Sequence, residues 1–192
     1  KAKSKLPSLY DKIFYPTDIS IEQCTTETVA EFHGSLFKGC DTVYDFTCGL
    51  GIDSFFISQN AKMVKSFDIN EKVAEIANEN YKRLNQTNIT AFQGDSTEVA
   101  KNIKEQISAC FIDPSRRDKT DSSSRLYSLE SCEPDVKIII DSIKDKANFL
   151  IVKASPMIDI TQTIKYIDEI SDIWIISIKN DCKELLFKVD FK

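Results

Sequence analysis

The stretch Asp45-Phe46-Thr47-Cys48-Gly49-Leu50-Gly51 constrains the fold more than any other part of this 192-residue chain. It follows the short run Thr42-Val43-Tyr44, which is typical of a buried strand, and precedes residues 52–58, which read as the start of a helix. Glycines lack a side chain, so the backbone can approach a ligand closely. Open α/β sheets bind ligands where their strands end. The stretch therefore predicts a nucleotide-sized pocket at the end of the first strand.

Apolar strands alternate with amphipathic helices along the rest of the chain. We expect strands at 42–45, 63–67, 89–92, 109–112, 149–152, 173–178 and 184–189, and helices at 26–37, from 53, and at 70–84, 97–105, 134–143 and 159–167. The strands show no polar alternation, and such strands separated by helices predict a parallel sheet covered on both faces. The last two strands are close in sequence, so we expect them to pair antiparallel.

Composition narrows the class of protein. The net charge of −5 and the pI near 5.0 argue against strong nonspecific binding of nucleic acid by this chain alone. No apolar run approaches the ~20 residues that span a bilayer, and no signal peptide is visible. Six cysteines without a CxxC pair predict reduced thiols in a cytoplasmic protein and no metal site. His33 lies among apolar residues, which indicates a packing role rather than a base or a ligand.

Carboxylates stand at the ends of four successive expected strands, namely Asp45, Asp68, Asp95 and Asp113. A single aspartate at such a position is common in turns and helix caps. In a parallel sheet, however, all four strand ends meet at the same edge. Four acids beside a glycine turn therefore predict a binding edge.

The position of the acids argues against a dinucleotide. Asp68 lies 17 residues after Gly51, where a carboxylate could accept hydrogen bonds from a ribose. The fingerprint GxGxxG, however, has Ser54 in place of its third glycine, and Asp45 would direct negative charge toward the pyrophosphate. The chain also lacks the phosphate-binding pattern GxxxxGK[ST]. Asp45 suits a cationic or amine-bearing ligand instead.

The stretch from Asp45 to Gly51 resembles the first motif of the Rossmann-like methyltransferases that depend on S-adenosyl-L-methionine (SAM). Phe67-Asp68 resembles their ribose-binding motif, and Gly94-Asp95-Ser96 resembles the segment that meets the adenine. The resemblance implies an α/β three-layer sandwich. Its seven-stranded sheet is mostly parallel, with an antiparallel final strand. A short N-terminal helical extension at 1–38 would precede a methyltransferase domain at 39–192.

A bacterial methyltransferase family that carries a THUMP-like domain after its catalytic domain is similar over a longer part of the chain, from about Thr17 to the end. The matching segments are Glu22-Gln23-Cys24-Thr25-Thr26-Glu27, Phe111-Ile112-Asp113-Pro114-Ser115-Arg116-Arg117-Asp118, Ser131-Cys132-Glu133-Pro134-Asp135, Lys153-Ala154-Ser155-Pro156-Met157 and Cys182-Lys183-Glu184-Leu185-Leu186. The chain stops at the last expected strand, so we expect the trailing domain to be absent. The trimethylguanosine synthases look similar over the first four motifs, which points toward RNA guanine.

The resemblance implies SAM as the cofactor and no metal. Asp45 would face the methionine amino group, Asp68 the ribose hydroxyls and Asp95 the adenine amino group. Gln23, Thr25 and Thr26 would cover the cofactor, or simply cap a helix. The implied cofactor-binding set is Gln23, Thr25, Asp45, Thr47, Gly49, Gly51, Asp53, Asp68, Ile69, Asp95, Ser96 and Asp113.

Asp113-Pro114-Ser115-Arg116 is similar to the catalytic [DN]PP[YFW] motif of the amino-methylating branch, which holds the target amine for an in-line displacement. Two positions depart from that motif, because Ser115 replaces the second proline and Arg116 replaces the aromatic residue. An arginine can stack on a base or grip a phosphate. We expect the basic residues of segment 115–130 to bind substrate as a lid, with a solvated loop as the alternative. They are Arg116, Arg117, Lys119 and Arg125.

These observations predict a cytoplasmic SAM-dependent methyltransferase that acts on an exocyclic or ring nitrogen of an RNA base, with rRNA or tRNA as its partner. Two alternatives stay open. One is a noncatalytic methyltransferase-like module that binds RNA or protein, and the other is a small-molecule methyltransferase. No oligomeric state is predicted.

Overall fold

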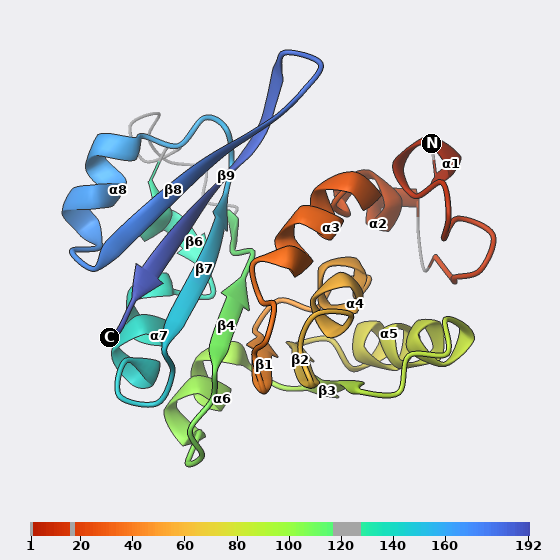
Figure 1. The fold of residues 1–192 in the computed structure, drawn as a ribbon, viewed down its shortest axis with the longest axis horizontal. Coiled ribbons are helices and arrows are strands. Elements are labelled where there is room, and N and C mark those ends of the chain that lie inside the picture. Colours follow the sequence, from red (N-terminus) through yellow and green to blue (C-terminus); the bar gives the residue numbers. More distant parts are fainter. Residues whose placement is uncertain (1, 16–17, 117–127) are drawn as a thin grey trace. The chain divides into compact units, whose positions relative to one another are not determined.

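The computed structural model describes residues 2–15, 18–116 and 128–192. Two compact units make up the chain, residues 1–95 and residues 96–192. Each unit combines strands with helices, as Figure 1 shows. The boundary that we predict between an N-terminal extension and a methyltransferase domain, at 38/39, is a different kind of division and stays a prediction.

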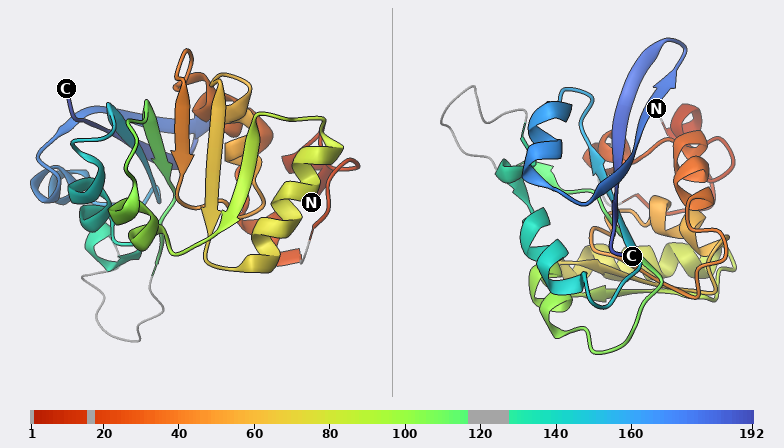
Figure 2. Two further views of the ribbon diagram at one scale, coloured as in Figure 1. Left: turned by 90° about the horizontal axis from the view of Figure 1, so that it is seen from below. Right: turned by 60° about the vertical axis from the view of Figure 1, so that its left-hand side comes forward.

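The first unit contains a parallel three-stranded part of the sheet. Its elements are α1 (Ala2–Lys5), α2 (Asp18–Gln23), α3 (Glu27–Ser35), β1 (Thr42–Asp45), α4 (Ile52–Ser58), β2 (Met63–Asp68), α5 (Glu71–Arg83) and β3 (Ile89–Gln93). The strands lie in the order β3-β2-β1. The parallel register pairs Asp45 with Ser66 and Asp68 with Gln93. Helices α4 and α5 cover the same face of these strands (Figure 2, left).

Local sequence explains the helices of this unit. The side chain of Asn70 caps α5 by accepting a hydrogen bond from the backbone N–H of Lys72 at 3.0 Å. The apolar positions of α5 then recur on one buried face, at Ala77 and Tyr81 among others. Helices α3 and α4 approach backbone to backbone at Gly34, where a Cβ would lie 2.4 Å from a carbonyl oxygen of α4. No bulkier residue fits there.

The second unit holds the remaining four long strands. Its elements are α6 (Ser96–Asn102), β4 (Ala109–Ile112), β5 (Ser115–Arg116), the 3₁₀ helix η1 (Leu129–Ser131), β6 (Cys132–Glu133), α7 (Val136–Ile143), β7 (Phe149–Ala154), α8 (Ile160–Tyr166), β8 (Ile170–Ile178) and β9 (Asp181–Asp190). Strand β4 pairs parallel with β7, whereas β9 pairs antiparallel with both β7 and β8. Helices α7 and α8 lie on the same side of these strands (Figure 2, right).

The seven long strands make up the mixed sheet of a Rossmann-like α/β fold. The predicted fold class is therefore confirmed, including the mostly parallel sheet and the antiparallel final strand, β9. Among the helices of the described residues, none is long and apolar enough to cross a membrane.

Several local predictions differ from the structure, including the last strand, β9, which begins at Asp181 rather than at 184. Helix α7 begins at Val136 rather than at Pro134, because the Asp135 side chain caps it by accepting from two backbone N–H groups, at 3.0 and 3.1 Å. Strand β8 begins three residues early, at Ile170, which pairs with Val189. The segment 115–130 is not a loop throughout, since β5 pairs antiparallel with β6 and residues 129–131 form η1.

Candidate functional site

The carboxylate of Asp45 is completely buried at the end of β1. Its Oδ1 accepts hydrogen bonds from the backbone N–H of Thr47 at 2.8 Å and from the Thr47 hydroxyl at 3.3 Å. Its Oδ2 accepts from the hydroxyl of Ser54, which is also completely buried. The serine that stands where a dinucleotide site has its third glycine thus fixes the orientation of Asp45.

The glycine turn after β1 requires glycine for two separate reasons. Gly51 is the N-cap residue of α4 and has φ at +78°, in the left-handed region that other residues rarely adopt. A Cβ at Gly51 would also lie 2.4 Å from the Tyr81 hydroxyl. At Gly49, in contrast, a Cβ would meet no atom of the described residues within 4 Å. The turn is therefore closed on the side of α5 and open at Gly49.

A buried polar cluster of Cys48, Ser66 and Tyr81 packs against the glycine turn. The Ser66 hydroxyl lies 3.3 Å from both the Cys48 sulfur and the Tyr81 hydroxyl, which are 3.6 Å from each other. Burial raises the pKa of the Cys48 thiol to about 12, with a smaller contribution from the charge of Asp45. Burial also raises the pKa of Tyr81 well above its ordinary value. Both groups are uncharged at neutral pH, which indicates a structural role.

Asp68, at the end of β2, joins the turn to the next strand. Its Oδ2 accepts from the backbone N–H of Gly49 at 3.1 Å, and its Oδ1 accepts from the backbone N–H of Asn70 at 2.9 Å. The neighbouring Ile69 side chain is 70% exposed. The backbone N–H of Gly94 donates to the Asp68 carbonyl at 2.9 Å. Three of the predicted segments, around Gly49, Asp68 and Gly94, therefore lie side by side.

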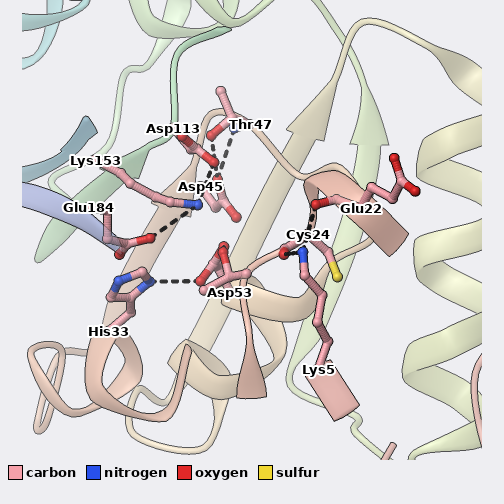
Figure 3. A network of polar contacts seen from close by, with 11 residues as sticks. Lys5, Glu22, Cys24, His33, Asp45, Thr47, Asp53, Asp113, Lys153 and Glu184 are labelled. Atoms are coloured by element: carbon pink, nitrogen blue, oxygen red, sulfur yellow. Dashed lines mark hydrogen bonds and ion pairs between the residues drawn. The ribbon is translucent and has the colours of Figure 1, made fainter. Parts of the chain in front are cut away.

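Asp53, near the start of α4, binds two side chains from the N-terminal part of the chain. The Thr25 hydroxyl donates to Asp53 Oδ2 at 2.6 Å. His33 Nδ1 lies 2.7 Å from Asp53 Oδ1, as Figure 3 shows. His33 is completely buried, as a packing residue would be, and its ring also lies within hydrogen-bond distance of the Asp53 carboxylate. The Thr25 hydroxyl therefore serves Asp53 rather than capping a helix.

The other two N-terminal candidates behave differently. Thr26 is the N-cap residue of α3 by position, yet its side chain makes no capping bond. Its buried hydroxyl oxygen has no hydrogen-bond partner within the part of the chain that the structure describes. Gln23 is exposed at the end of α2.

In the second unit, Asp113 follows β4 and forms an ion pair with Lys153 of β7. Lys153 Nζ lies 2.7 Å from Asp113 Oδ2 and 3.7 Å from Glu184 Oε2, as drawn in Figure 3. The side chains of Lys153 and Glu184 are only 11% and 10% exposed, whereas that of Asp113 is 38% exposed. The parallel register, which pairs Ile112 with Val152, places Asp113, the residue after β4, next to Lys153 within β7.

A small pocket of about 50 Å³ lies beside this ion pair, with Pro114, Cys132, Lys153 and Ser155 among its lining residues. Ser115 and Arg116 form β5. The predicted substrate-binding residues Arg117, Lys119 and Arg125 lie outside the described residues.

Sequence reasoning missed Lys153 and Glu184 as site residues. The available signal was that Lys153 directly follows the expected strand 149–152, as Asp113 follows the expected strand 109–112. The role of Ser54 and the link between His33 and Asp53 had no comparable signal. Those pairs are 9 and 20 residues apart in sequence, and only the folded helices bring them together.

The fold is similar to that of solved methyltransferase structures. A proposed methyltransferase from Porphyromonas gingivalis W83 has a TM-score of 0.87 and 24% identity over 98% of this chain and 46% of its own. A second, from Streptococcus mutans, was solved in complex with S-adenosyl-homocysteine (SAH). It has a TM-score of 0.56 and 17% identity over 84% of this chain and 96% of its own.

One curated relative is similar in sequence. An uncharacterized RNA methyltransferase of Clostridium tetani is 29% identical over 53% of this chain and 25% of its own length. The chain thus spans a quarter of that relative and less than half of the P. gingivalis protein. No protein-family model matches the chain.

Proposed function

We propose that the first unit binds SAM and that the chain is a methyltransferase acting on a nitrogen of an RNA base. One observation carries the proposal. The carboxylate of Asp68 is held by the backbone N–H of Gly49, in the open glycine turn that follows a buried Asp45. The name of the Clostridium tetani relative and the SAH in the Streptococcus mutans protein support it.

The residues present fit a nucleoside cofactor. A carboxylate with fixed orientation, Asp68, stands beside the exposed apolar side chain of Ile69, which suits a ribose diol next to a flat base. The open space at Gly49 lets backbone approach the ligand. The buried Thr26 hydroxyl has no partner among the described residues, so it could bond to a ligand.

Each acid in the first unit has a proposed role. Asp45 accepts from the methionine amino group, Asp68 accepts from the ribose hydroxyls, and Asp95 accepts from the adenine amino group. The remaining residues that we propose for the cofactor are Gln23, Thr25, Thr47, Gly49, Gly51, Asp53, Ile69, Ser96 and Asp113.

In the second unit, Asp113-Pro114-Ser115-Arg116 would hold the target nitrogen, with Asp113 accepting a hydrogen bond from it. When bound, SAM supplies a methyl group: the nitrogen–carbon bond forms as the carbon–sulfur bond breaks, the electron pair stays on sulfur, and the nitrogen loses its proton to solvent. The protein contributes mainly by positioning the nitrogen. Arg116, Arg117, Lys119 and Arg125 would contact rRNA or tRNA in the cytoplasm.

The motifs of residues 22–27, 111–118, 131–135, 153–157 and 182–186 support a closer assignment, to the bacterial family with a THUMP-like domain. The likeness to trimethylguanosine synthases supports guanine as the base. The net charge of −5 and the departures at Ser115 and Arg116 favour a second candidate, a noncatalytic binding module. A small-molecule methyltransferase is the third.

Transfer of labelled methyl groups tests the proposal. The protein is incubated with methyl-tritiated SAM and total RNA from cells that lack the gene. We expect label in RNA, lost after ribonuclease digestion. Asp113→Ala should abolish transfer while weakening SAH binding far less than Asp68→Ala does, because Asp113 is only one of the residues proposed for the cofactor. Asp141→Ala, which removes an exposed aspartate of α7, should change neither transfer nor binding.

The outcomes separate the candidates. Binding of SAM without transfer to RNA, protein or small molecules would favour the noncatalytic module. Label that enters only small molecules would favour the third candidate. Full transfer by Asp113→Ala would show that the motif assignment is wrong.

A further inference from the structure

Lys153 is a nearly buried lysine held between two carboxylates. Its ammonium group lies 2.7 Å from Asp113 Oδ2 and 3.7 Å from Glu184 Oε2, and its side chain is 11% exposed. Residues Leu150, Ile151 and Val152 before it are apolar and buried. Lysine is almost never buried unless it is paired, so the two carboxylates are what retain this charge at the end of β7.

Strand pairing makes this arrangement specific. Strand β7 lies between β4, which ends just before Asp113, and β9, which carries Glu184. Lys153 can therefore reach one carboxylate on each side. The stronger contact is with Asp113, which sits on the segment after β4 and is the most exposed of the three side chains.

We propose that Lys153 is a positioning residue for Asp113 in the methyl transfer, an inference that rests on the proposed function. A carboxylate offers about four lone-pair sites on its two oxygens. The bond from Lys153 uses one of them on Oδ2 and fixes the rotamer of Asp113. The carboxylate then meets an N–H donor in a set direction. Glu184 holds the ammonium group from the opposite side and keeps it in place.

Precise placement matters here because a displacement of ~1 Å away from the reacting atoms can cost about a hundredfold in rate. The ion pair with Lys153 limits the rotamers that the partly exposed side chain of Asp113 can adopt. The acceptor that this arrangement selects is a group that donates a hydrogen bond, such as an amine or ring N–H. An acceptor without a hydrogen, such as a thiolate or carboxylate, would be repelled by Asp113.

A second lysine in the same unit provides a matched control. Lys188 of β9 lies 2.8 Å from Asp190 and 3.8 Å from Asp172. Lys188 is also a lysine with two carboxylate partners. It lies near the other end of the paired strands β7 and β9, where Asp190 pairs with Phe149. Substitution of Lys188 reports the general effect of breaking such an ion pair.

The experiment compares Lys153→Met, Lys153→Arg and Lys188→Met in methyl transfer from tritiated SAM to total RNA. We expect Lys153→Met to lower kcat at least tenfold, with the KM for SAM and the Kd for SAH within twofold of wild type. Lys153→Arg should recover kcat to within about threefold, since arginine retains the ion pair. Lys188→Met should transfer at the wild-type rate.

Wild-type kcat in Lys153→Met, or failure of the arginine variant to recover activity in a folded protein, would overturn the inference. If Lys153→Met does not fold, Glu184→Gln decides, because it neutralises the carboxylate 3.7 Å from Lys153 and leaves the Lys153–Asp113 ion pair in place. Its kcat should fall while SAH binding is kept, and an unchanged kcat would count against the role. Absence of transfer by the wild-type protein would instead remove the proposed function itself, and this role with it.

Discussion

The carboxylate of Asp68 accepts a hydrogen bond from the backbone N–H of Gly49 at 3.1 Å. This bond ties the end of β2 to the glycine turn after β1. It therefore holds together two sequence motifs that lie 19 residues apart in the chain. The same carboxylate is also fixed by Asn70, so its orientation is set before any ligand arrives. Preorganised acceptors of this kind bind at a lower cost in entropy.

Asp68→Ala should weaken the binding of SAH at least tenfold, because it removes the acceptor proposed for the ribose and loosens the turn at Gly49. Isothermal calorimetry measures this Kd. Asp41→Ala is the control, since Asp41 is an exposed aspartate paired with the exposed Lys62 just before β1. Equal affinity for SAH in Asp68→Ala and the control would contradict the assignment.

Gly51→Ala should destabilise the protein more than Gly39→Ala. Both glycines have φ near +80°, but a Cβ at Gly39 meets nothing within 4 Å among the described residues, whereas at Gly51 it meets the Tyr81 ring. The strained backbone alone costs about 1–2 kcal/mol. The contact with Tyr81 adds about 1–3 kcal/mol, as overpacking does. Urea unfolding measures both values, and equal losses would show that the turn can move away from Tyr81.

His33→Phe should lower the free energy of unfolding by about 3 kcal/mol, because it leaves the largely buried Asp53 carboxylate without one of its hydrogen-bond partners. A second change, Asp53→Asn, should recover part of that loss by removing the charge. Lys62→Ala, which breaks the exposed pair with Asp41, should leave the melting temperature almost unchanged. If His33→Phe melts at the same temperature as Lys62→Ala, the buried pair contributes nothing.

The free energy of unfolding should fall at alkaline pH because of the buried thiol of Cys48. Its thiol has a pKa near 12 when folded, against an ordinary value of 9.0, so between these values the unfolded thiol ionises and the folded one does not. The stability is therefore complete below about pH 9 and falls as the pH rises toward 12. In Cys48→Ala, the fall between pH 8.5 and 10.5 should be smaller by about 2 kcal/mol. Cys182→Ala, at a half-exposed cysteine, should retain the full fall, and identical curves for both variants would refute the prediction.

Local patterns predict most of the fold because they act within one element. Continuous apolar residues identify β4, and the spacing of Ala77 and Tyr81 identifies α5. The start of α7 differs from the prediction. Pro134 is favourable as a first helical residue, but the side chain of Asp135 caps the helix, which therefore begins at Val136.

The side-chain partners of the site could not be predicted in the same way. The acids at the strand ends follow from the parallel order of the strands. The pair formed by Asp113 and Lys153, 40 residues apart, depends on which strand lies beside β4. The three-way contact of Thr25, His33 and Asp53 depends on how α3 packs on α4. Both are tertiary relationships, and no periodicity encodes them.

Calorimetric titration of the wild-type protein with SAH is the decisive measurement for the proposal that the first unit binds SAM. Every enzymatic function proposed for the chain requires this binding. We expect saturable binding at one site per chain, weakened by Asp68→Ala and unchanged by Asp41→Ala. An absence of binding at millimolar SAH, in a protein that unfolds cooperatively, would contradict the proposal.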